Sequence, residues 1–226
     1  MELIMEQFPI VIQSLNVGFL QTLKLFFVTL LGALPLGLII AFGSMSHFRP
    51  LKYITNIIVW VVRGTPLMIQ MLIIYYFPGL VLNNVVWGGG ESGRFVAASV
   101  AFIFNYACYF SVIYRGGIQS VPQGQTEAGR SLGLNFSQTM RLIIIPQAFK
   151  NVLPALVNEF IVLIKETSII GYIGMMDLTK GAMLIQSRTY NAFWPLMAAA
   201  AIYLVIVGIL TWGMNKLERR LRTSER

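Results

Sequence analysis

Charged residues are scarce in this chain. Asp, Glu, Lys and Arg together make up 12% of the 226 residues, against about 25% in an average soluble domain. So few charges cannot cover a water-facing surface, and hydrophobic residues account for 56% of the sequence. The composition therefore excludes an ordinary soluble protein and predicts an integral membrane protein.

Residues and motifs of catalytic chemistry are equally scarce. The single cysteine, Cys108, excludes an intrachain disulfide, and its apolar setting favours a buried hydrophobe over a reactive thiol. The only histidine is His47, so we expect neither a histidine-based triad nor a metal site. No G-x4-G-K-[ST] motif occurs, so we expect the chain to bind no nucleotide cofactor and to hydrolyse no ATP itself.

Five apolar runs are long enough to cross a bilayer, which needs about 20 helical residues because lipid cannot satisfy backbone polar groups. They cover residues 17–42, 54–77, 95–114, 152–172 and 193–214. The fourth is the weakest because it contains Glu159, Lys165 and Glu166. We predict an all-α membrane protein with about five transmembrane helices, forming a single domain over residues 1–226.

The distribution of basic residues predicts the orientation. Cations cluster in the loop after the first run, in the loop over residues 115–150 and in the C-terminal tail, where they include Arg49, Arg130, Lys150 and Arg219. By the positive-inside rule these segments are cytoplasmic, which places the N-terminus outside and the C-terminus inside. The net charge of +8 is then a topology signal. No nucleic-acid partner is expected, because the cations are dispersed without interleaved exposed aromatics.

The segment from Gln123 to Pro146 is polar and lies between apolar runs. Ser120 with Gln123 fits a capping box, Pro122 suits a first helical turn, and Glu127 lies early enough to favour the helix dipole. Gly133 is placed to end this helix in a left-handed conformation, and Asn135 or Ser137 can cap a second helix that runs toward Pro146. We predict a helix, a tight turn and a second helix.

Two interpretations of this loop are open. An amphipathic helix pair can rest on lipid head groups, or it can dock on a partner protein. Residues 124–132 are rich in small and neutral polar side chains and contain only Arg130 as a cation. Lipid-surface helices usually carry more Lys, Arg and bulky apolar residues. The composition therefore favours protein docking.

Here the sequence resembles a known family. Glu127-Ala128-Gly129-x3-Gly133-x9-Ile143-x-Ile145-Pro146 is similar to the EAA motif of ABC-importer permeases, E-A-A-x3-G-x9-I-x-L-P, with Gly129 in place of Ala and Ile145 in place of Leu. Further motifs resemble the histidine, glutamine and arginine permease type over nearly the whole chain. They are Arg63-Gly64-Thr65-Pro66-Leu67, residues 114–125, Pro146-Gln147-Ala148, Asn158-Glu159-Phe160, Lys165-Glu166-Thr167-Ser168 and residues 216–221.

The resemblance implies a type I importer fold in a bacterial inner membrane. It implies a second permease subunit, identical or paralogous, two ATPase subunits that hold ATP and Mg, and an extracytoplasmic amino-acid-binding protein. The loop then forms a coupling helix gripped by the ATPase, with docking residues Glu127, Ala128, Gly129, Arg130, Leu132, Gly133 and Leu134. Small residues such as Ala128, Gly129 and Gly133 would permit close approach to the partner.

Charged residues at membrane depth are candidates for the transport path. The predicted path contains Arg63, Thr65, Asn105, Glu159, Glu166 and Ser168. Glu159 and Glu166 are seven residues apart and share a helical face, so they are suited to hold the ammonium or cationic group of an amino acid. The alternative is a structural role, in which they pair with Lys165, Arg63 or a partner subunit.

Arg63 and Asn105 also have two interpretations. Arg63 either meets the substrate carboxylate or a gating ion pair, or is a structural charge where Gly64 and Pro66 break the helix. Asn105 favours a hydrogen bond between helices over contact with a ligand.

These features predict the permease subunit of an ATP-driven importer of a polar L-amino acid. The alternatives are a carrier or channel driven by an ion gradient, or a membrane enzyme. A carrier has no need of a capped cytoplasmic docking helix, and the sequence offers no nucleophile, metal or acid–base set for an enzyme.

Overall fold

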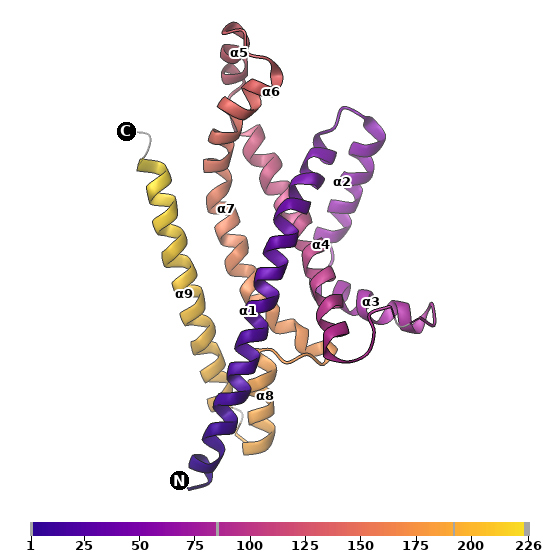
Figure 1. The fold of residues 1–226 in the computed structure, drawn as a ribbon, viewed down its shortest axis with the longest axis vertical. Coiled ribbons are helices and arrows are strands. Elements are labelled where there is room, and N and C mark those ends of the chain that lie inside the picture. The colour runs from indigo at the N-terminus through magenta and orange to yellow at the C-terminus, as the bar shows by residue number, and fades with distance from the viewer. Residues whose placement is uncertain (1, 85, 192, 224–226) are drawn as a thin grey trace. The chain divides into compact units, whose positions relative to one another are not determined.

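The computed structural model describes residues 2–84, 86–191 and 193–223, and the side chains of residues 15–84, 86–191 and 193–220. All regular structure in these residues is helical (Figure 1). The elements in order are α1 (Glu2–Met45), α2 (Arg49–Arg63), α3 (Leu67–Leu80), α4 (Gly90–Gln119), α5 (Gln123–Ser131), α6 (Phe136–Thr139), the π-helix η1 (Met140–Ile144), α7 (Ile145–Glu166), the 3-10 helix η2 (Thr167–Ile173), α8 (Leu178–Thr189) and α9 (Phe193–Thr223). The all-helical fold is confirmed.

The chain divides into two compact units, each assembled from three separate stretches. Unit 1 contains Met1–Gly32, Thr65–Ile103 and Ile161–Leu210, and unit 2 contains Ala33–Gly64, Phe104–Phe160 and Thr211–Arg226. The helices α1, α4, α7 and α9 each contribute residues to both units. The prediction of one domain over the whole chain stays a prediction.

Three of the described helices are long and apolar enough to cross a membrane. They cover Leu15–Met45, Gly90–Gln119 and Phe193–Arg220. A fourth span is counted if α2 and α3, which pass the test together, are one span interrupted at residues 64–66. The charged fourth run forms α7 and η2, and α7 is not among these candidates. The count by length and composition is therefore three to four, and the predicted orientation of the termini stays a prediction.

Unit 1 is held together around the start of α8. Leu178, Ala182 and Ala199 form a buried cluster, against which Phe19 and Tyr203 pack. Asp177 is buried and caps α8, because its carboxylate accepts hydrogen bonds from the backbone N–H of Thr179 at 3.2 Å and of Lys180 at 2.9 Å. These bonds satisfy two of the donors that a helix N-terminus leaves unpaired.

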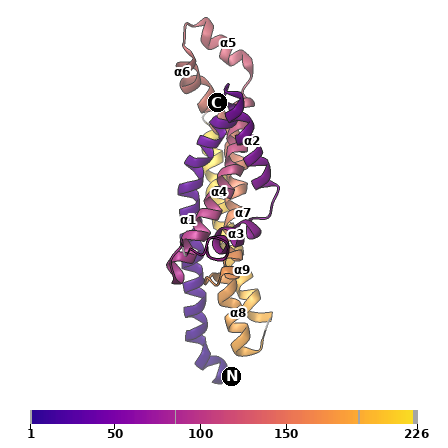
Figure 2. The same cartoon turned by 90° about the vertical axis from the view of Figure 1, so that its right-hand side faces the viewer.

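Unit 2 brings α4 and α7 together. The rings of Phe110 and Phe160 meet edge to face with centroids 5.9 Å apart. Val121 just after α4, Ile144 at the end of η1 and Ala148 on α7 form a second buried cluster. Beyond this cluster the short helices α5 and α6 project past the ends of α4 and α7 (Figures 1 and 2). Apolar packing therefore fixes the base from which the α5–α6 segment extends.

Candidate functional site

The start of α5 differs from the predicted capping box. Pro122 is the N-cap and makes no side-chain capping bond. Ser120 instead donates its hydroxyl to the Gly117 carbonyl at 2.8 Å and accepts a hydrogen bond from Asn151 Nδ2 at 2.9 Å. The capping box was wrong because Ser120 lies too far before the helix and bonds to α4 and α7 instead.

Glu127 lies further into α5 than the sequence predicts. The helix α5 begins at Gln123, spans nine residues and has no acidic residue in its first turn. Glu127 is therefore in the middle of α5, where the macrodipole gives it little stabilisation because the effect fades beyond the first turn.

The end of α5 follows the prediction. Gly133 has φ of +78° and lies just past the C-cap Leu132. Its N–H donates to the Arg130 carbonyl at 2.9 Å, and the N–H of Leu134 donates to the Gly129 carbonyl at 3.0 Å. These two bonds form a Schellman motif, which pairs the last carbonyls of the helix and requires a residue that tolerates positive φ. The tight turn at Gly133 is confirmed.

Asn135 is the cap of the second helix. Its side-chain oxygen accepts a hydrogen bond from the N–H of Gln138 at 2.9 Å, and its own N–H donates to Gln138 Oε1 at 2.9 Å. This is a complete capping box. Of the two predicted caps, Asn135 is confirmed and Ser137 is wrong. A Schellman motif thus joins directly to a capping box, and the two motifs fix the backbone of the turn.

The second helix does not stop at Pro146. It passes through η1 and continues as α7 to Glu166. In η1 the N–H of Ile145 donates to the carbonyl of Met140, five residues earlier. A proline lacks an N–H and its ring crowds the carbonyl four residues before it, and the wider π turn relieves that crowding. The α5–α6 segment is therefore continuous with a long helix of unit 2.

Gly129 is the point where the two short helices touch. A Cβ at this position would lie 2.9 Å from Thr139 Cγ2 and 3.0 Å from Thr139 Oγ1, which is closer than packed atoms tolerate. Gly129 and Thr139 are both buried. The glycine that departs from the EAA pattern thus permits close packing within this chain. Its predicted approach to a partner stays a prediction.

The surface of the α5–α6 hairpin, by which we mean residues 123–139, carries two large apolar side chains. Leu132 is 78% exposed and Phe136 is 71% exposed. Glu127, Ala128 and Arg130 are exposed on α5, Gly133 is exposed, and Leu134 is half-buried. Sequence reasoning missed Phe136. Its signal was a lone aromatic directly after the predicted cap Asn135.

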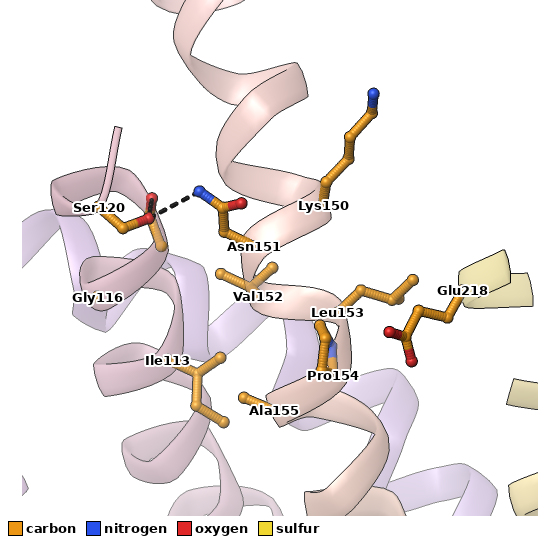
Figure 3. A pocket seen from close by; sticks show the side chains of 11 residues that line it. Ile113, Gly116, Ser120, Lys150, Asn151, Val152, Leu153, Pro154, Ala155 and Glu218 are labelled. Atoms are coloured by element: carbon orange, nitrogen blue, oxygen red, sulfur yellow. Dashed lines mark hydrogen bonds between the residues drawn. The ribbon is translucent and has the colours of Figure 1, made fainter. Parts of the chain in front are cut away.

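The base of the hairpin borders a pocket of about 660 Å³ formed by α4, α7 and α9 within unit 2. Figure 3 shows its apolar wall at Ile113, Leu153 and Pro154, with the Glu218 carboxylate on one side and Lys150 extending away from it. The bond between Asn151 and Ser120 lies at its rim (Figure 3). The pocket therefore offers few polar groups that converge on one point.

The predicted path residues of unit 2 lie on three helices. The guanidinium carbon of Arg63, at the end of α2, lies 5.0 Å from the centroid of the Tyr109 ring on α4. Asn105 is buried and lies one helical turn before Tyr109 on α4, whereas Glu159 is half-buried on α7. The structure thus joins Arg63 to Tyr109, a residue that sequence reasoning missed although Asn105 and Tyr109 have the spacing of one helix face.

The other predicted path residues belong to unit 1. Thr65 follows the break after α2, and its hydroxyl accepts a hydrogen bond from Gln70 Nε2 at 2.6 Å. Glu166 ends α7 and Ser168 lies in η2, and both are half-buried. Glu159 and Glu166 share a continuous helix but fall in different units. The predicted helix break at Gly64 and Pro66 is confirmed, and the roles of the predicted path residues stay predictions.

Comparisons with known proteins identify the family. Residues 33–223 match the family described as the binding-protein-dependent transport system inner membrane component. The chain belongs to this family.

Similar proteins agree with this membership. The arginine transport system permease protein ArtQ of Bacillus subtilis is 38% identical over 97% of this chain and 95% of its own length. A putative glutamine transport system permease protein GlnP of Rickettsia conorii is 35% identical over 90% of this chain and 91% of its own length. The L-cystine transport system permease protein TcyB of B. subtilis is 37% identical over 92% of this chain and 86% of its own length.

Solved structures share the fold. One, described as an amino acid ABC transporter with histidines, has a TM-score of 0.85 and 40% identity over 96% of this chain and 97% of that chain. An inward-facing MetNI methionine ABC transporter has a TM-score of 0.69 at 19% identity, which shows the fold alone. This permease chain is therefore an inner-membrane component of a transport system, with the fold of type I importers.

Proposed function

We propose that this permease moves a polar L-amino acid through an ATP-driven importer. An extracytoplasmic binding protein delivers the amino acid, and two separate ATPase subunits hold ATP and Mg and dock on the α5–α6 hairpin. A second permease subunit, identical or paralogous, completes the complex. Support comes from the binding-protein-dependent family and from relatives that are named arginine, glutamine and cystine permeases.

The observation that carries the docking proposal is the exposed apolar pair on the hairpin. Burying a leucine or phenylalanine side chain stabilises an interface by roughly 1.5–3 kcal/mol each. Leu132 and Phe136 lie on either side of a turn that the Schellman motif and the capping box hold in one conformation. A rigid turn with two apolar anchors is suited to fill a groove on a partner.

The hairpin also has the continuity that mechanical coupling requires. The helix that begins at Asn135 runs through η1 into α7 without a flexible loop. Gln147 Nε2 on α7 donates a hydrogen bond to Gln125 Oε1 on α5 at 3.3 Å, which ties the start of the hairpin to the same helix. Movement of an ATPase that grips residues 123–139 would therefore displace α7, which carries Glu159.

The test is truncation of the two anchors. We expect Leu132→Ala with Phe136→Ala to weaken co-purification of the ATPase subunits and to reduce transport, while the permease still inserts in the membrane. Loss of two packed side chains costs about 2–5 kcal/mol in an interface. Leu204→Ala is the matched control, because Leu204 on α9 is 73% exposed.

Normal ATPase recovery with the double variant would contradict the docking proposal, and so would equal loss with the control. Gly133→Asp is a second, independent test of docking, because it strains the turn and adds charge at the hairpin. We expect it to insert normally, to bind the ATPase weakly and to lose transport.

We further propose that Arg63 and Glu159 recognise the two charged ends of the amino acid. Arg63 would bind the carboxylate, since a guanidinium binds carboxylates through paired N–H groups, and Glu159 would bind the ammonium. The Tyr109 ring lies against the Arg63 guanidinium and can hold it in place. Asn105, a buried residue of α4 in the same unit, is a further candidate for this path.

A further inference from the structure

The last part of α9, the yellow end in Figure 1, carries a basic and aromatic face within unit 2. Trp212, Asn215, Lys216, Arg219 and Arg220 line a hollow of about 630 Å³, and all five are exposed. Their spacing of three or four residues puts them on one face of the helix. We refer to these five residues as the basic stripe.

Charges are segregated around this part of the helix. The described residues that line the hollow include three cations and no carboxylate. Glu218, in the same two turns, lines the separate pocket against α4 and α7 (Figure 3). The anionic side chain therefore faces the protein, while the cationic side chains share a different face.

An aromatic ring is part of the basic stripe. The Lys216 ammonium lies 5.1 Å from the centroid of the Trp212 ring. The candidate span Phe193–Arg220 ends within the stripe, and only 17% of its apolar window is buried by this chain. Tryptophan is enriched where a span meets the lipid head groups, and lysine and arginine follow it toward water. The stripe therefore has the composition and the position of a membrane interface.

We propose that the basic stripe binds the head group of an anionic phospholipid. Arg219 and Arg220 suit the phosphodiester, because a guanidinium pairs two N–H groups with two phosphate oxygens. Lys216 adds a compact positive charge and Asn215 an amide donor, while Trp212 contacts the glycerol and upper acyl region. Basic residues that directly follow a membrane span favour anionic lipid in this way. Such lipid binding is separate from the transport step and independent of the amino acid carried.

The test compares lipid retained by the purified complex. Phosphatidylglycerol and phosphatidylcholine are supplied in equal amounts, and the lipid that remains per chain after detergent purification is measured by mass spectrometry. We expect the wild-type complex to retain phosphatidylglycerol preferentially and Lys216→Gln/Arg219→Gln/Arg220→Gln to retain at least about tenfold less. The matched control is Arg49→Gln/Lys52→Gln, since both residues are exposed cations of α2 in the same unit.

A second readout locates the lipid. Brominated phosphatidylglycerol should quench the part of the fluorescence that Trp212→Phe removes, and should quench it more than brominated phosphatidylcholine does. Four outcomes would overturn the proposal. Three of them are equal retention of phosphatidylglycerol by the triple variant, equal loss in the control, and no preference between the two lipids. The fourth is protection of the stripe from solvent only when the ATPase is bound, which would identify a protein contact instead.

Discussion

At the scale of single residues, Gly129 packs closely against Thr139 in the α5–α6 hairpin. Thr139 is fixed there, because its hydroxyl donates to the Asn135 carbonyl at 3.0 Å. We expect Gly129→Ala to force α5 away from α6 and to cost about 1–3 kcal/mol, the usual cost of an overpacked contact. Hydrogen exchange of the backbone amides of residues 128–139 should then become faster.

The contact supplies its own control. Thr139→Ala removes the two nearest atoms that the new Cβ would meet and leaves only Ile143 Cδ1, at 3.2 Å, among its three nearest neighbours. Gly129→Ala/Thr139→Ala should therefore recover part of the lost protection and part of the ATPase attachment. If the losses of protection caused by Gly129→Ala and by Thr139→Ala simply add in the double variant, the close contact is not their cause. The departure from the EAA pattern would then have no packing explanation.

Arg63 and Glu159 provide the residue-scale prediction about substrate. We expect Arg63→Gln and Glu159→Gln each to raise the KM for uptake by about tenfold or more, because each removes one charge-assisted hydrogen bond. Glu218→Gln is the matched control, since Glu218 is a half-buried carboxylate of the same unit outside the proposed path. Unchanged uptake kinetics for both path variants in a folded complex would reject the assignment.

At the level of single residues, the sequence pointed to polar side chains in apolar runs but not to the aromatic residues. Arg63, Asn105 and Glu159 are conspicuous because polar residues are costly in an apolar run. Tyr109 could not be selected in the same way, because aromatic residues are common in membrane helices, and Phe136 lies outside the apolar runs in which such charges were sought. Their placement over Arg63 and at the hairpin surface depends on how separate helices pack.

At the scale of elements, the cap of α8 is open to a pH test. Burial raises the pKa of the Asp177 carboxyl above its usual value, although the bonds from Thr179 and Lys180 oppose the rise. The folded protein binds this proton more tightly than the unfolded chain does. The protein therefore loses stability as pH rises from the pKa of the carboxyl in the unfolded chain to its higher pKa in the folded state. Asp177→Asn keeps the cap without the charge and should remove this dependence.

Two substitutions separate the cap from the charge. At neutral pH, Asp177→Asn should unfold at a temperature no lower than wild type, whereas Asp177→Ala should lose about 1 kcal/mol together with the cap. The measurement is thermal unfolding of the detergent-solubilised protein at several pH values. Equal destabilisation by both variants would show that the negative charge, and not the cap, stabilises α8.

Local signals predicted elements well where the chemistry is local. Gly133 and Asn135 were predicted correctly, because a Schellman motif and a capping box involve neighbours within a few residues. The predicted capping box at Ser120 was wrong because the Ser120 hydroxyl bonds with a residue distant in sequence, Asn151. The continuation through Pro146 was missed because a π turn in η1 leaves no mark in hydrophobic periodicity.

At the scale of the whole molecule, composition predicted an all-helical membrane protein and motif order predicted its family. The comparisons confirm both. The number of spans is harder to predict, because α7 combines apolar residues with charges and α2 is separated from α3 by a break. Charged and interrupted segments at membrane depth are tolerated where they are buried in protein or line a cavity. Transport function therefore produces the same irregularities that obscure a hydropathy count.

We propose that this permease is driven by ATP hydrolysis on a partner subunit. The most direct measurement is uptake of labelled amino acids by proteoliposomes that contain the purified permease, its ATPase and its binding protein. We predict uptake that requires ATP on the ATPase side, stops with vanadate and continues in the presence of an uncoupler. Uptake that persists with vanadate and stops with an uncoupler would contradict ATP-driven transport and identify a carrier driven by an ion gradient.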